Sequence, residues 1–137
     1  MKGCESMELD KSGLEGRIFE GFAATSTKRY VYLCNMTTGV SRWSKNAVEY
    51  FDLPGEFHKN AGMIWAEKIH PEDRPAFLKS DEEIFSGKTD FHEMEYRVLN
   101  REGDYVVVTC RGVVMRGTEN EHDLFLATIS NHGITEN

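Results

Sequence analysis

The segment Trp65-Ala66-Glu67-Lys68-Ile69-His70-Pro71-Glu72-Asp73-Arg74 is the most informative stretch of the sequence. A histidine beside two carboxylates first suggests a metal site or an acid–base pair. A metal site, however, needs three or four converging ligands, and neighbouring carboxylates at a helix start point in different directions. Pro71 suits the first position of a helix, and Glu72 and Asp73 in the first turn favour the helix dipole. We therefore interpret the segment as the beginning of a helix that extends to Gly87.

The surrounding sequence predicts an α+β fold with one antiparallel sheet. Alternating, β-branched and aromatic residues predict strands at 30–36, 40–43, 92–99, 105–115 and 124–130. Apolar residues at helical spacing predict helices at 14–25, from the N-cap Ser44 to Phe51, and at 71–87. Residues 56–62 are expected to be irregular and 65–69 to form one short helical turn, while Gly103 is expected to form a tight turn at positive φ.

Strand 105–115 is apolar on both faces, so both faces of the sheet are expected to be covered. Short helices would cover one face, and either the helix at 14–25 or a second copy of the chain would cover the other. The apolar stripe of the helix at 14–25 consists of Leu14, Ile18, Phe19 and Phe22.

Composition narrows the function classes. A chain of 137 residues fits one domain, and its net charge of −7 argues against nucleic acid or an anionic membrane as the main partner. The cysteines Cys4, Cys34 and Cys110 lack the paired spacing of a disulfide framework or zinc site, which favours a reducing, cytoplasmic compartment. No apolar run reaches membrane-spanning length.

Several residues that could have a functional role are explained as well by a structural one. Nucleophile and phosphate-loop signatures are absent, and Glu95 and Arg97 are expected to form cross-strand pairs. Cys34 is more often an inert buried thiol than a redox sensor. Trp65 could line a pocket, although tryptophans are more often core anchors. His92 and His132 are expected to be exposed.

Three elements together resemble a known family. The segment 65–74, the strand motif Glu95-Tyr96-Arg97 and the turn Asn100-Arg101-Glu102-Gly103-Asp104 are similar in order and spacing to a subgroup of PAS domains. One departure is Val106-Val107, where this subgroup often has a Trp. The resemblance implies a PAS fold over residues 30–131, with a five-stranded antiparallel sheet in the order 2-1-5-4-3, short helices on one face and an N-terminal helix. It also implies a tail and dimerisation helix at 1–29 and a linker toward an output domain at 132–137.

The resemblance also bears on cofactors and partners. The flavin-binding subgroup carries a reactive Cys in an Asn-Cys-Arg motif and haem-binding subgroups use a His on the long helix; neither occurs here, so no cofactor is expected and flavin and haem are disfavoured. The C-terminal residues 129–137 resemble the segment that leads into a diguanylate cyclase domain, whose catalytic Gly-Gly-Asp-Glu-Phe motif is absent from the chain. A bacterial signalling protein with a C-terminal output domain is therefore expected.

The sequence thus predicts a non-catalytic sensor and dimerisation module of a cytoplasmic signalling protein. A small ligand would bind between the sheet and the helices, lined by Cys34, Trp65, Met94 and Tyr96, and a homodimer would form through the apolar stripe of the helix at 14–25. Two alternatives stay open. One is a ligand-free protein–protein adaptor, and the other is a small enzyme that uses His70 with Asp73.

Overall fold

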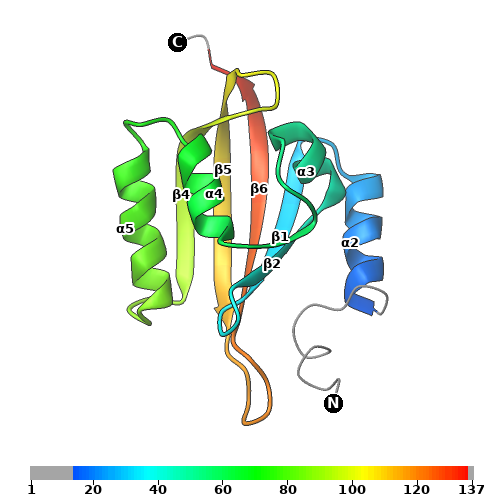
Figure 1. The fold of residues 1–137 in the computed structure, drawn as a ribbon, viewed down its shortest axis with the longest axis vertical. Helices are drawn as coiled ribbons and strands as arrows, with labels where there is room; N and C mark the ends of the chain where they lie inside the picture. The colour runs from blue at the N-terminus through cyan, green and yellow to red at the C-terminus, as the bar shows by residue number, and fades with distance from the viewer. Residues whose placement is uncertain (1–13, 136–137) are drawn as a thin grey trace.

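The computed structural model describes residues 14–135, and the polar tail expected at 1–13 lies outside these residues. The chain forms one antiparallel sheet with helices packed on both of its faces (Figure 1). The helices are α2 (Leu14–Thr25), α3 (Lys45–Phe51), α4 (Ala61–Lys68) and α5 (Arg74–Phe85). The strands are β1 (Arg29–Asn35), β2 (Val40–Trp43), β3 (Phe57–Lys59), β4 (Phe91–Leu99), β5 (Tyr105–Met115) and β6 (Leu124–Ile134).

The sheet has six strands in the order β3-β2-β1-β6-β5-β4, with every pairing antiparallel. The prediction of five strands in the order 2-1-5-4-3 is therefore wrong in strand count and in the order of the complete sheet. The added strand is β3, which pairs with β2 at Arg42 and Phe57 and occupies the edge that β2 was expected to form. Three residues without a repeating alternation are too short to show the strand pattern, which is why residues 56–62 looked irregular.

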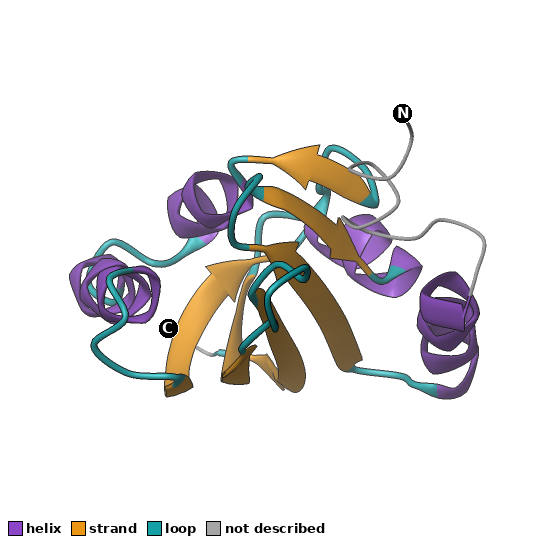
Figure 2. Cartoon of the chain, turned by 90° about the horizontal axis from the view of Figure 1, so that it is seen from below, coloured by secondary structure: helices purple, strands orange, loops and turns teal. Residues whose placement is uncertain are grey.

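The inner face of the sheet packs against α3, α4 and α5 (Figures 1 and 2). The alternation of β4 places Tyr96 and Val98 in this core, while Glu93 and Glu95 face outward and are exposed. The sharp turn after β4 has Gly103 at a φ of 88°, as the sequence predicted. Helix α4 extends for two turns, from Ala61 to Lys68, rather than for one.

Helix α5 begins later than the sequence suggested. Residues 71–73 form a turn in which the N–H groups of Asp73 and Arg74 donate to the carbonyl of His70, and the helix starts at Arg74 with Pro75 in its first turn. The assignment of Pro71 to the first helical position is therefore wrong. Pro75 meets the same requirement, because a proline in the first turn lacks only an N–H that has no partner within the helix.

Helix α2 lies on the other face of the sheet, at the end formed by β1 and β2. Phe19 is buried against Val31 and Leu33, and the guanidinium carbon of Arg42 lies 4.8 Å from the ring centres of both Phe19 and Phe57. The expected cover by the N-terminal helix is thus confined to one end of this face. Phe91 remains 73% exposed on β4 at the opposite edge.

Strand β6 is longer than predicted. It was expected to end at Ser130 but continues to Ile134, so the first residues of the range assigned to a linker, 132–137, form part of the sheet. Residues 136 and 137 lie outside the described part of the chain. No helix in the part of the chain that the structure describes is long and apolar enough to cross a membrane.

Candidate ligand cavity and the segment beside it

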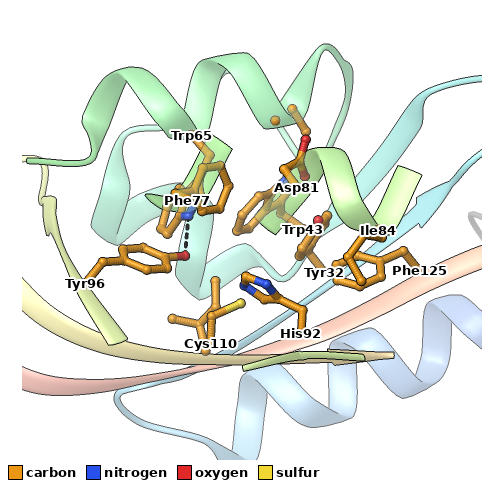
Figure 3. Close-up of a pocket in the computed structure, with 13 residues that line it drawn as sticks. Tyr32, Trp43, Trp65, Phe77, Asp81, Ile84, His92, Tyr96, Cys110 and Phe125 are labelled. Carbon is orange, nitrogen blue, oxygen red and sulfur yellow. Dashed lines mark hydrogen bonds between the residues drawn. The ribbon is translucent and has the colours of Figure 1, made fainter. Parts of the chain in front are cut away.

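A cavity lies between the inner face of the sheet and helices α4 and α5 (Figure 3). Its volume is about 20 Å³, which is room for about one water molecule. Thirteen side chains or backbone positions line it: Tyr32, Trp43, Ala61, Gly62, Trp65, Phe77, Asp81, Ile84, His92, Tyr96, Cys110, Phe125 and Ile129. Both tryptophans of the chain are among them.

Trp65 and Tyr96 join α4 to the sheet at this cavity. The indole N–H of Trp65 donates to the phenolic oxygen of Tyr96 over 2.6 Å, and both side chains are buried. Cys110 on the neighbouring strand β5 borders the same cavity. Burial raises the pKa of Tyr96 well above its usual range, because the charged phenolate would be desolvated. The hydrogen bond between Trp65 and Tyr96 therefore joins two neutral groups and holds α4 against the sheet beside the cavity.

Asp81 is the one charged side chain among the residues that line the cavity. Its carboxylate reaches inward from α5 and lies close to Gly62 on α4, where an added Cβ would be 3.6 Å from its Oδ2. Among the described residues it has no hydrogen-bond or ion-pair partner, and burial raises its pKa. The side chain is partly buried, so the ionised carboxylate lowers stability to the extent that this desolvation is not offset by a partner.

Two further polar groups complete the cavity wall. His92, which was expected to be exposed, is buried and its Nδ1 lies 2.6 Å from the hydroxyl of Ser80 on α5. Burial lowers the pKa of this imidazole, which favours the neutral ring. The expectation of exposure is wrong because His92 lies four residues before Tyr96 on β4, and alternate residues of a strand share one face, here the buried one. Trp43 Nε1 is buried without a hydrogen-bond partner among the described residues.

The four residues predicted to line a ligand site separate into two pairs. Trp65 and Tyr96 border the cavity, whereas Cys34 and Met94 face the same core but do not line it. Burial raises the pKa of the Cys34 thiol, and it raises that of Cys110 to about 12. Both thiols are therefore protonated and unreactive near neutral pH. A ligand role for any of the four residues stays a prediction.

Sequence reasoning did not find Asp81 or His92. Asp81 looks like an ordinary surface carboxylate in the run Asp81-Glu82-Glu83, and only its position relative to Phe77 and Ile84, both buried on α5, hints at an inward orientation.

The segment 65–74 does not form an acid–base site. Asp73 receives three hydrogen bonds of 2.9 Å from Arg97, one from the backbone N–H and two from the guanidinium, while Glu72 receives one at 3.1 Å. Arg97 holds the pKa of Asp73 below its usual value. The expectations that these carboxylates point apart and that Arg97 pairs across the sheet are wrong, since both carboxylates converge on Arg97 from the turn before α5. Ser44 is at the N-cap of α3, as predicted, but its hydroxyl does not cap the helix. It accepts a hydrogen bond from the backbone N–H of Val31 instead.

His70 has a local role beside this cluster. Its Nδ1 accepts from the backbone N–H of Glu72 over 3.1 Å, and its ring lies 4.8 Å from that of Tyr105. Asp73 is committed to Arg97, which leaves His70 without a carboxylate to orient it as a catalytic base. Among the described residues, no group of three or more potential ligands could hold a metal ion.

The predicted dimerisation residues have different environments on α2. Phe19 is buried within the chain and Phe22 packs partly against the same cluster, whereas Ile18 is 59% exposed. The side chain of Leu14 lies outside the described residues. Ile18 is therefore the described member of this set that is free to contact a second molecule, and dimerisation stays a prediction.

The fold of this chain has counterparts among known proteins. A sequence profile described as the PAS fold matches residues 40–129, more than half of the chain. The chain belongs to the PAS family. The resemblance that began with segment 65–74 is confirmed. PAS domains are sensory domains of signalling proteins.

Solved structures share the fold of this PAS domain at low sequence identity. A sensory box histidine kinase/response regulator from Burkholderia thailandensis is 24% identical with a TM-score of 0.59, covering 82% of each chain. The N-terminal domain of a diguanylate cyclase with PAS/PAC sensor from Marinobacter aquaeolei is 21% identical with a TM-score of 0.63, covering 76% of this chain and 94% of that one.

A PAS-B domain of Cycle from Drosophila melanogaster, solved with bound glycerol, is 16% identical with a TM-score of 0.56, covering 74% of this chain and 98% of that one. No curated protein sequence matches the chain. At these identities the solved structures show a common fold and nothing more specific.

Proposed function

We propose that this PAS domain is a non-catalytic sensory module that binds a small ligand in the cavity between the inner sheet face and helices α4 and α5. The observation that supports the proposal is a pair of polar groups on the cavity wall, the partly buried carboxylate of Asp81 and the buried indole N–H of Trp43, neither of which has a partner among the described residues. A core that served only packing would gain stability from apolar residues at such positions. A bound ligand would supply the hydrogen-bond or ion-pair partners that these two groups lack.

The geometry suggests how a bound ligand would act on the domain. Its affinity must differ between two arrangements of the helices and sheet, since a ligand with equal affinity for both shifts nothing. The Asp73–Arg97 ion pair fixes the beginning of α5 to β4. Two turns later, Ser80 contacts His92 of β4 over 2.6 Å, while the neighbouring Asp81 has no such partner among the described residues. Entry of a ligand larger than a water molecule would therefore have to break the Ser80–His92 contact and displace the later turns of α5, while the Asp73–Arg97 ion pair holds its beginning.

Strand β6 offers a route from the cavity to an output domain. Phe125 and Ile129 of β6 line the cavity, and the strand continues to Ile134 near the end of the chain (Figure 1). We infer that a signal passes along β6 to a C-terminal output domain, with a diguanylate cyclase as the favoured class. The sequence after Asn137 in the full-length protein would test this inference directly, and any catalytic or partner-binding domain other than a diguanylate cyclase there would contradict the favoured class.

Native mass spectrometry tests the ligand proposal. The purified domain is expected to carry an additional mass that denaturation releases. The fraction of protein that carries this mass is expected to decrease when Trp65 is replaced by Phe, because the replacement removes the N–H that orients Tyr96. A native mass equal to the denatured mass, in cell extracts and after addition of candidate small molecules, would refute a ligand-binding role.

A second function, that of a ligand-free dimerisation adaptor, is favoured by the small volume of the cavity, which is nearly filled by aromatic side chains. In this case α2 would supply the contact through Ile18. Replacing Ile18 with Asp is expected to convert a dimer to a monomer in light scattering, without loss of the folded state, because the side chain is exposed. A matched Arg17→Asp change on the exposed part of the same turn is the control. An unchanged dimer in the Ile18 variant would exclude this surface.

A further inference from the structure

The cavity proposed above as a ligand site is lined by one negative charge. Of its lining residues, Asp81 alone carries a formal charge at neutral pH, and neither lysine nor arginine is among them. The remaining wall is apolar apart from neutral hydrogen-bonding groups, so the local potential is negative and weakly screened by solvent. Such a site repels carboxylates and phosphates and attracts cations.

Aromatic rings surround the same space. Tyr32 stacks on Trp43 with ring centres 4.5 Å apart, and Trp65 packs beside Trp43 at 5.0 Å, so these three rings form one continuous wall. Tyr96 and Phe125 close further sides (Figure 3). The faces of aromatic rings carry negative partial charge and stabilise cations within about 6 Å of the ring centre, most strongly for Trp. An aromatic wall with one carboxylate is the arrangement that recognises organic ammonium groups.

We propose that the cavity binds a small protonated amine, whose ammonium group pairs with Asp81 and lies against the rings of Trp43 and Trp65. This proposal rests on the proposed sensory function and specifies the chemical class of its ligand. A metal ion fits less well, because calcium and magnesium need six or more oxygen ligands. Among the described residues Asp81 is the only carboxylate at the cavity, and a volume of about 20 Å³ leaves no room for the waters that would complete the coordination. Ammonium is near the size of the present cavity, whereas methylammonium and larger amines require the later turns of α5 to move.

Methylammonium chloride is the first probe, and the two tryptophans provide the readout. Titration is followed by the NMR resonance of the Trp65 indole N–H and by the melting temperature, at constant ionic strength set with potassium chloride. Methanol is the neutral control of similar size, and tetramethylammonium tests whether a larger cation opens the cavity. Asp81→Asn removes the charge with little change in shape, and Glu82→Gln makes the same change at the next residue of α5, which is exposed.

The wild-type domain and the Glu82 variant are expected to show a saturable shift with methylammonium, and the Asp81 variant to bind at least tenfold more weakly. Methanol is expected to give no saturable shift. Equal binding by wild type and Asp81→Asn, or no saturable response to any of the three cations ammonium, methylammonium and tetramethylammonium, would overturn the proposal. If a co-purified neutral molecule is found in the cavity by native mass spectrometry, the amine proposal fails while the sensory function stands. If neither cation nor neutral ligand binds, both fail.

Discussion

Helix α5 has two aspartates that experience opposite environments. Asp73, at its beginning, accepts three hydrogen bonds from Arg97, and its pKa is lowered. Asp81, two turns along, faces an aromatic cavity with no partner among the described residues, and its pKa is raised. The first fixes the helix to the sheet. The second lowers stability at the site where a ligand is proposed to bind.

This contrast separates a carboxylate that has a structural partner from one that has none among the described residues. A paired carboxylate adds to stability, so its retention needs no further function. An unpaired carboxylate that is partly buried reduces stability, and its presence is explained if a bound group supplies the missing partner. The four predictions below test the two halves of the contrast, beginning with the largest expected effect.

Replacing Asp73 with Ala is expected to lower the free energy of unfolding by about 1–2 kcal/mol, because Arg97 loses its main partner and partial exposure softens the loss. Urea unfolding measures the change. A double-mutant cycle with Arg97→Ala should show clear coupling between the two residues. A loss below the error of the measurement would show that the ion pair does not anchor α5.

Replacing Asp81 with Asn is expected to raise the free energy of unfolding by about 0.5–1 kcal/mol, because an uncharged amide is less costly to desolvate than a carboxylate. The matched change Glu82→Gln on the exposed face should leave stability unchanged. If the Asp81 variant is less stable than wild type in the absence of ligand, Asp81 has a stabilising partner. That result would contradict the difference drawn between a paired Asp73 and an unpaired Asp81.

Lowering the pH should affect the two variants differently. The raised pKa of Asp81 means that its ionised form destabilises the native state above that pKa, and that the penalty disappears as the pH falls through it toward the ordinary value of 3.8. The lowered pKa of Asp73 means that its contribution persists until the pH falls below 3.8.

Unfolding of wild type and both variants between pH 7 and pH 3 provides the measurement. The stability gained by Asp81→Asn should shrink toward zero at the acidic end, while the loss caused by Asp73→Ala should remain until the pH is below the ordinary carboxyl value. The histidines titrate in all three proteins, so their effects cancel in the differences. A gain from Asp81→Asn that did not vary with pH would show that charge is not its cause.

The smallest effect is expected at Glu72, the other carboxylate that contacts Arg97. Its side chain is 76% exposed, so Glu72→Gln should change the free energy of unfolding by less than about 0.5 kcal/mol. Thermal unfolding in low and high salt would measure it. A loss as large as that of Asp73→Ala would mean that the two carboxylates act as one unit rather than as an anchor and a weak neighbour.

Much of the fold follows from local patterns. The bounds of α2 match the helical spacing at 14–25, and the alternation of β4 identified the inward side of Tyr96. The sequence failed where the pattern was short or depended on a distant partner. Strand β3 is three residues long and exists through its pairing with β2, and β6 extends past Ser130 because it pairs with β5 as far as Ile134.

The candidate site shows the same division. Trp65 and Tyr96 were proposed from the sequence and border the cavity, but their hydrogen bond joins residues 31 positions apart. His92 was assigned to the surface because a single polar residue near the end of a strand gives no sign of what covers it. The buried position results from Phe77 and Ser80 of α5, which pack above it.

The sequence by itself determined the family, the approximate elements and the inward faces of the long strands, because periodicity reports which side of an element is apolar. It did not determine which carboxylate has a partner. Asp73 and Arg97 lie 24 positions apart in the chain and meet only when α5 packs against β4, and Asp81 is left without a partner by the same packing. Tertiary structure therefore decided that the conspicuous carboxylates of segment 65–74 hold the fold together, and that an inconspicuous one marks the candidate ligand site.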